Sequence, residues 1–183
     1  MTGRLAGCES RGVQQSRRLV IVRHAEAEQA AATDAERALA ASGHDDARAG
    51  GAWLAGRSVR PDHALVSAAR RAQETWASLA AGAAWEVEPE VSRSLYTAEP
   101  ETALDLLREV PAEAAAVVVV GHNPTMASLA HLVDDGTGDE AAATDLAVRG
   151  FPPCSIAVFE YDGAWVALDA TSARLAAFHV GRS

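Results

Sequence analysis

The chain has 183 residues, 49% of them hydrophobic, and a formal net charge of −9; this size and composition suit a single domain with its own core. The negative charge repels a phosphate backbone, so we expect no nucleic-acid partner. Two cysteines, Cys8 and Cys154, do not make a disulfide framework, and we expect a cytoplasmic location.

The chain offers no segment for a membrane. Its longest purely apolar stretch, residues 114–120, is too short for the roughly 20 residues of a transmembrane helix. Residues 1–17 contain several arginines but lack the apolar region typical of a secretory signal. We therefore interpret residues 1–17 as a flexible N-terminal extension and expect the folded domain to span residues 18–183.

Three short apolar runs predict buried strands at residues 18–23, 62–67 and 116–121. Each run is followed by residues with the periodicity of a helix, and this alternation is typical of a parallel sheet. We therefore predict an α/β fold, a three-layer sandwich in which helices cover both faces of a mostly parallel sheet.

The first helix is expected at residues 45–56. Ala49, Ala52 and Trp53 recur at helical spacing and are predicted to form its inner face. The Gly50-Gly51 pair weakens this helix, since each glycine costs about 1 kcal/mol relative to alanine.

Three further helices are expected: one directly after the second predicted strand, one between the second and third strands, and one directly after the third strand. The second follows Ser67, and the others begin at Pro100 and at Asn123-Pro124. Proline is tolerated in the first turn of a helix, where its missing N–H would have no partner.

The C-terminal part is expected to contain a loop and a hairpin. Residues 134–150 are acidic and mostly aperiodic, which indicates a loop. Residues 155–160 and 165–168 are short apolar runs around Asp162-Gly163, a dipeptide typical of tight hairpin turns. We therefore predict an antiparallel hairpin formed by these two runs.

Two of the predicted strands end in a histidine. Arg23-His24 follows the first strand, and Gly121-His122 closes the third. If these strands are parallel, both rings lie at the carboxyl edge of the sheet, where ligand sites of open α/β sheets gather. A neutral imidazole is a competent nucleophile, so His24 is the candidate nucleophile. His122 precedes a helix N-terminus and is expected to bind a phosphate oxygen.

Arginine and serine side chains complete a predicted phosphate site. Arg23 and Arg71 present planar forks of donors that match phosphate oxygens. Ser67 ends the second strand, where its hydroxyl is able to donate to phosphate or to cap the next helix. The acidic residues 134–140 lack the pattern of a calcium loop, and no glycine-rich nucleotide motif follows a strand. We therefore expect no metal and no cofactor.

The order of these motifs resembles that of the histidine phosphatase superfamily, also called the phosphoglycerate mutase-like family, and most closely its bacterial phosphohistidine phosphatase branch. The resemblance covers residues 18–180 and implies that the first histidine carries the phosphoryl group while the other three groups form the phosphate pocket, without metal or cofactor. The segments that carry it are Arg23-His24-Ala25-Glu26, residues 34–37, Ser42-Gly43, residues 67–75 and Gly121-His122-Asn123-Pro124. The catalytic residues implied are His24, Arg23, Arg71 and His122, with Ser67, Arg23, Arg71 and His122 binding substrate.

The chain departs from the family pattern at three points. Ala25 stands where glycine is common in the superfamily, and Ala38 where proline is frequent in the branch. The glutamate-glycine pair that supplies a general acid in many members is absent, leaving Glu90 and Glu99 as candidates. Without an acid, a poor alkoxide leaving group is disfavoured relative to phosphohistidine.

The sequence thus predicts a phosphatase that acts through a phosphohistidine on His24, with phosphohistidine in a protein as substrate. Two alternatives stay open: a phosphomonoesterase or mutase for a small phosphorylated metabolite, and a phosphate-binding adaptor without catalysis. The partner is accordingly a phosphorylated protein or small molecule, and the oligomeric state is open, a monomer being compatible. His44, His63, His131 and His179 are given no catalytic part.

Overall fold

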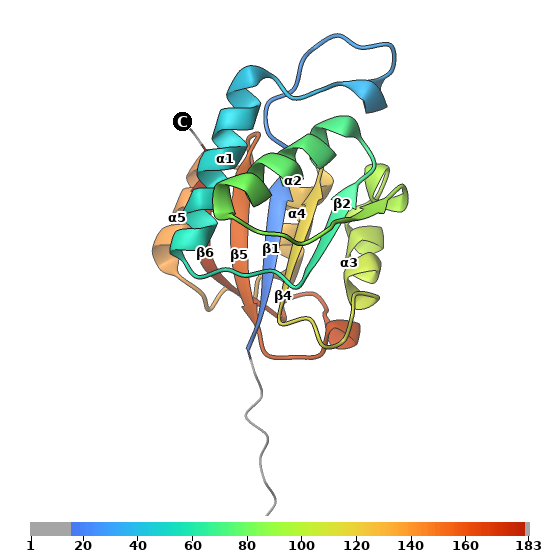
Figure 1. Ribbon diagram of the computed structural model, residues 1–183. Helices are drawn as coiled ribbons and strands as arrows, with labels where there is room; N and C mark the ends of the chain where they lie inside the picture. The colour runs from blue at the N-terminus through green and yellow to red at the C-terminus, as the bar shows by residue number, and fades with distance from the viewer. Residues whose placement is uncertain (1–15, 182–183) are drawn as a thin grey trace, which may run out of the picture.

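The computed structural model describes residues 16–181, and in this part of the chain six strands form one sheet in the order β3-β2-β4-β1-β5-β6 (Figure 1). Strands β1 to β4 pair in parallel, whereas β5 is antiparallel to both of its neighbours. This confirms the predicted mostly parallel sheet with antiparallel C-terminal strands. The strands are β1 (Arg17–Arg23), β2 (His63–Ser67), β3 (Glu90–Ser92), β4 (Ala116–Gly121), β5 (Ser155–Tyr161) and β6 (Arg174–Val180).

The predicted extension, residues 1–17, lies outside the described residues as far as residue 15. Strand β1 begins at Arg17, one residue before the predicted start. The short edge strand β3 was not predicted, because its three residues show no apolar run.

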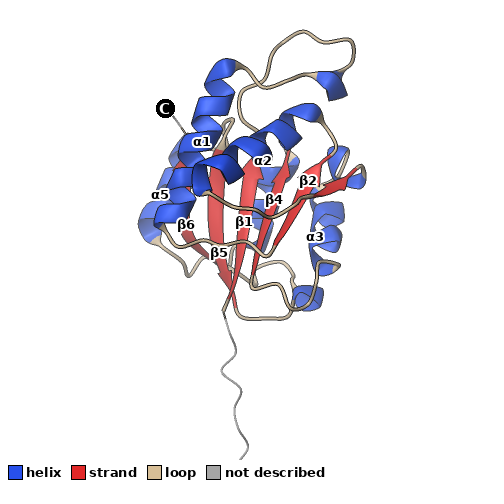
Figure 2. Ribbon diagram, in the orientation of Figure 1, coloured by secondary structure: helices blue, strands red, loops and turns tan. Residues whose placement is uncertain are grey.

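Helices cover both faces of the sheet, as predicted (Figure 2). Because side chains alternate along a strand, β1 contributes to two cores. Val20 and Val22 pack with α1 and α2 on one face, whereas Leu19 and Ile21 pack with α3, α4 and α5 on the other. The helices are α1 (Ala41–Gly56), α2 (Arg70–Ala83), α3 (Pro100–Arg108), α4 (Thr125–Val133) and α5 (Glu140–Arg149).

Glycines allow α1 and α2 to pack closely, and this changes the predicted face of α1. A Cβ on Gly51 would lie 2.0 Å from the carbonyl oxygen of Leu79, and one on Gly82 would lie 2.0 Å from that of Arg48. The helix therefore turns its glycines inward, and the predicted inner face was wrong: Ala49 and Trp53 are half-buried and Ala52 is exposed. The buried residues of α1 are Gly43, Ala47, Gly50, Gly51 and Leu54.

The prediction of a loop at residues 134–150 was wrong for most of this segment, which forms α5. The Asp139 carboxylate caps the helix by accepting the N–H of Ala142 at 2.8 Å. Only Ala142 and Leu146 are buried along it. Two apolar contacts spaced four residues apart are too few to give a clear helical periodicity in the sequence.

The structure confirms the first strand of the predicted hairpin, but the prediction of its second strand was wrong. Strand β5 pairs with β6, about a dozen residues further along, and residues Trp165–Ala167 form a short 3-10 helix instead. Trp165 is 1% exposed, and its indole N–H donates to the carbonyl of Ala114 at 2.8 Å. Burial of this large ring outweighs the local strand pattern.

No helix within residues 16–181 is long and apolar enough to cross a membrane.

Candidate active site

The carboxyl ends of three neighbouring strands bring the predicted site residues together. Arg23 of β1 pairs in register with Gly121 of β4, so the residues that follow, His24 and His122, leave the sheet side by side. The backbone N–H of His24 donates to the carbonyl of Gly121 at 2.9 Å. The two imidazole centroids are 5.1 Å apart. The parallel pairing of β1 and β4 thus places both histidines at one edge, as the sequence indicated.

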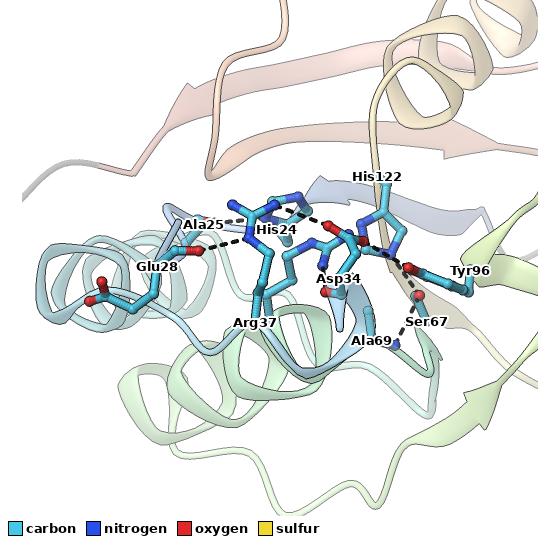
Figure 3. Close-up of polar contacts among 10 residues, drawn as sticks. His24, Ala25, Glu28, Asp34, Arg37, Ser67, Ala69, Tyr96 and His122 are labelled. Carbon is cyan, nitrogen blue, oxygen red and sulfur yellow. Dashed lines mark hydrogen bonds and ion pairs between the residues drawn. The ribbon is translucent and has the colours of Figure 1, made fainter. Parts of the chain in front are cut away.

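The ring of His24 is held in one tautomer. Its Nδ1 lies 2.7 Å from the carbonyl oxygen of Ala25, which only accepts, so Nδ1 is the donor and Nε2 keeps its lone pair (Figure 3). Burial lowers the pKa of His24 to about 4, and the positive charges of Arg71 and Arg23 act in the same direction. The ring is therefore neutral at pH 7, and Nε2 is available as a nucleophile.

His122 is bound to the end of β2. Its Nε2 lies 2.7 Å from the hydroxyl of Ser67, which is fully buried. Burial, followed by the neighbouring His24, lowers the pKa of His122 to about 3. Its Nδ1 is buried and has no hydrogen-bond partner among the described residues. A buried polar atom of this kind is costly unless a ligand or water satisfies it.

The two predicted arginines are anchored by other parts of the chain. Arg71 of α2 is 6% exposed, and its Nη1 and Nη2 donate to the backbone and side chain of Asp34 at 2.6 and 2.9 Å. Arg23 donates from Nη1 to the carbonyl of Phe151 at 2.9 Å. The Nε atoms of both are buried without a partner in the described part of the chain. Each guanidinium thus retains donor capacity for an anion.

Asp34 and Tyr96 were given no role from the sequence, yet they belong to the same cluster. The Tyr96 hydroxyl donates to Oδ2 of Asp34 at 2.7 Å, and the Tyr96 ring meets that of His122 edge-on. The hydrogen bond from Tyr96, then those from Arg71 and Arg37, hold the pKa of the Asp34 carboxyl well below its usual range. Asp34 is therefore ionised and is not a proton donor.

Arg37 adds a third guanidinium, also missed. It donates from Nε to the carbonyl of Glu28 at 2.7 Å and from Nη1 to Oδ1 of Asp34 at 3.2 Å. Figure 3 shows its side chain beside His24, and its charge contributes to the lowered pKa of that histidine. The sequence signal for Asp34 and Arg37 was the segment 34–37, which the family resemblance placed in a linker; Tyr96 had no such signal.

The two candidate general acids do not join the cluster. Oε2 of Glu90 lies 3.3 Å from Nε2 of His63, at the start of β2 and so at the opposite end of that strand from Ser67. Glu99 is exposed where α3 begins, and its side chain makes no hydrogen bond or ion pair with the described residues. Among residues 16–181, no three histidine, cysteine or acidic side chains gather in a way that could hold a metal ion.

The structure is an α/β protein in which histidine and arginine side chains gather at the carboxyl edge of its sheet. The family model described as histidine phosphatase superfamily (branch 1) matches residues 19–95. Together with the relatives below, this shows that the chain belongs to the histidine phosphatase superfamily.

Relatives match over nearly the whole domain. The uncharacterised protein Rv1276c of Mycobacterium tuberculosis is 32% identical over 149 residues, which are 81% of this chain and 92% of that protein. A provisionally named phosphohistidine phosphatase SixA from Nakamurella multipartitia is 30% identical, with a TM-score of 0.78 over 90% of this chain and 95% of that one. Its counterpart from Agrobacterium tumefaciens is 28% identical, with a TM-score of 0.71 over 89% and 97%.

Proposed function

We propose that the protein is a phosphatase that transfers a phosphoryl group to His24 and then to water, and that its substrate is phosphohistidine in a protein. The observation that carries the proposal is the 2.7 Å contact between Nδ1 of His24 and the carbonyl of Ala25. This contact leaves the lone pair of Nε2 free, and the charges of Arg71, Arg23 and Arg37 all act on the ring. The names of the two similar solved structures support the same substrate.

In the first step, the Nε2 lone pair of His24 attacks phosphorus while the bond from phosphorus to the leaving imidazole breaks. The leaving imidazole keeps the bonding electron pair and takes up a proton from solvent, so that it departs as a neutral ring. The His24 ring gains positive charge, which the Ala25 carbonyl stabilises through the Nδ1–H that it already accepts. Arg23 and Arg71 bind the equatorial oxygens, and His122 binds a further oxygen. Because the folded protein already holds these side chains in place, the entropic cost of reaching the transition state is smaller.

In the second step, water attacks phosphorus and the bond to Nε2 breaks. Inorganic phosphate leaves, the water proton passes to solvent or phosphate, and His24 returns to its neutral form. Because Nδ1 stays protonated throughout, the departing ring is neutral, which makes it a good leaving group.

Within residues 16–181, neither candidate acid, Glu90 or Glu99, makes a hydrogen bond or ion pair with the site residues, and this favours a substrate whose leaving group departs easily. Asp34 is the carboxylate of the cluster, and its lowered pKa keeps it ionised. Glu90 lies beside His63, at the opposite end of β2 from Ser67. An alkoxide loses the roughly 10²- to 10⁴-fold help of a general acid in such a site, whereas an imidazole leaves from phosphorus more readily. This supports phosphohistidine over an alkyl phosphate.

Rapid-quench experiments with a ³²P-labelled N-phosphorylated substrate test the proposal. We expect acid-labile label on the wild-type protein and on His44→Ala, and none on His24→Ala. Label that survives in His24→Ala would exclude this nucleophile. Binding of phosphate without turnover of any substrate would instead favour the adaptor.

A further inference from the structure

A buried hydroxyl below the site links the helix that carries Arg71 to the turn that carries His24. Thr75 lies on α2, one turn after Arg71, and is fully buried. Its Oγ1 donates to the Arg71 carbonyl at 2.6 Å and accepts the backbone N–H of Ala25 at 3.0 Å. One side chain thus bonds to both functional segments.

Thr75 is connected to the His24 ring through one residue, Ala25. The N–H of Ala25 is held by Thr75, and the carbonyl of the same residue accepts the proton on Nδ1 of His24 at 2.7 Å. Rotation of Ala25 would therefore break or lengthen both contacts. Which nitrogen of a neutral histidine carries the proton is decided by the hydrogen bond that the other nitrogen makes.

The donor and acceptor roles of the hydroxyl are settled by its partners. A carbonyl only accepts, so the Thr75 proton goes to Arg71, and the lone pairs of Oγ1 remain for the Ala25 N–H. Back-bonding of threonine to the fourth preceding carbonyl is common in helices. The second contact, to a turn fifty residues earlier, has no such local reason.

We propose that Thr75 is a positioning residue that sets the tautomer of His24 by fixing the backbone of Ala25, and so keeps Nε2 as the nucleophilic nitrogen. It contacts no substrate. The catalytic part of this inference rests on the proposed function, but the tautomer itself is a property of the resting protein.

Thr75→Val removes the hydroxyl with little change in volume, and Thr75→Ser keeps it. Ser78→Ala is the matched control, since Ser78 lies on the same helix and its hydroxyl is 2.9 Å from Nδ1 of His44, outside the site. We expect Thr75→Val to lower the rate of phosphoenzyme formation by about tenfold to a hundredfold, with little change in KM, as expected for a small misplacement of a reacting group. Thr75→Ser and Ser78→Ala should stay near the wild-type rate.

¹⁵N NMR of the histidine rings gives a readout that a merely structural role would not move. In the wild type and in Thr75→Ser, we expect His24 protonated on Nδ1, whereas Thr75→Val should show a mixture of the two tautomers. If Thr75→Val does not fold, Thr75→Ala takes its place.

A variant without the hydroxyl that melts earlier but keeps the rate and the Nδ1–H tautomer would overturn the proposal. So would loss of the tautomer in Thr75→Ser. If the wild type forms no phosphoenzyme, the proposed function fails, while the NMR comparison still decides the role of Thr75.

Discussion

Asp34 binds Arg71 through two oxygen atoms, its backbone carbonyl at 2.6 Å from Nη1 and its carboxylate at 2.9 Å from Nη2. The two residues are 37 positions apart. A guanidinium on the helix after β2 is thus oriented by the loop after β1, at the edge where His24 lies. Because an ordered donor contributes more to a transition state than a mobile one, Asp34 is expected to matter for turnover without contacting phosphorus.

Replacement of Asp34 by alanine should lower kcat/KM by about tenfold, because Arg71 keeps only a backbone contact and Tyr96 loses its acceptor. Steady-state kinetics on an N-phosphorylated substrate measure the effect. Glu36→Gln, in the same exposed turn, is the matched control and should stay near wild type. Equal rates in all three proteins would contradict an orienting role for Asp34.

Arg71→Lys should reduce turnover by about 10²-fold, although the charge is kept, because lysine cannot reproduce the planar fork. The adjacent Arg70 offers a close comparison: its side chain is 59% exposed and pairs with Glu74, whereas that of Arg71 is 7% exposed. Arg70→Lys should change the rate by less than about twofold, as is usual for a surface ion pair. Similar losses in both variants would argue against a phosphate-binding role for Arg71.

The two site histidines should titrate far below the ordinary histidine pKa of 6.5, His24 near 4 and His122 near 3. Burial disfavours the charged rings, so the unfolded chain binds protons that the folded protein does not as pH falls below about 6.5. Stability should therefore decrease from pH 6.5 toward pH 4. NMR titration of the ring protons and melting curves at pH 7 and pH 5 measure the two effects. A titration midpoint near pH 6.5 for His24 would contradict the predicted low pKa of its ring.

Leaving-group preference should be strong. We expect N-phosphorylated imidazole to be hydrolysed at least about 10²-fold faster than a simple alkyl phosphate, because Asp34 is ionised and, within residues 16–181, neither Glu90 nor Glu99 bonds to the site residues. Glu90→Gln and Glu99→Gln should leave both rates nearly unchanged. Fast hydrolysis of alkyl phosphates that is abolished by either substitution would instead favour the metabolite phosphatase and assign the acid.

Gly51→Ala should destabilise the protein by about 1–3 kcal/mol, despite the better helix propensity of alanine, because the new methyl group would overlap the Leu79 carbonyl of α2. Gly56→Ala is the control on the same helix. A Cβ there has no atom within 4 Å, so it should stabilise the protein by about 0.5–1 kcal/mol. Urea denaturation of both variants tests the pair, and stabilisation by Gly51→Ala would show that the helices can separate at little cost.

Much of the architecture follows from local patterns. Apolar runs of valine and isoleucine marked three of the parallel strands to within one residue at each end. Because parallel strands end at the same edge, the placement of His24 beside His122 also followed from sequence order. Ser67, Arg23 and Arg71 lie at that edge as well, so the candidate site was predicted in its main parts, whereas its catalytic roles stay predictions.

What the sequence by itself determined was the set of strands, most of the helices and the meeting of two histidines, since these depend on short-range periodicity and strand direction. Only the tertiary structure decided that Asp34 orients Arg71, that Thr75 holds Ala25, and that β5 pairs with β6 rather than with the segment around Trp165. Each of these depends on which distant groups meet once the core is buried. The free energy of such contacts depends on desolvation and geometry between residues far apart in the chain, so it produces no periodic pattern in the sequence.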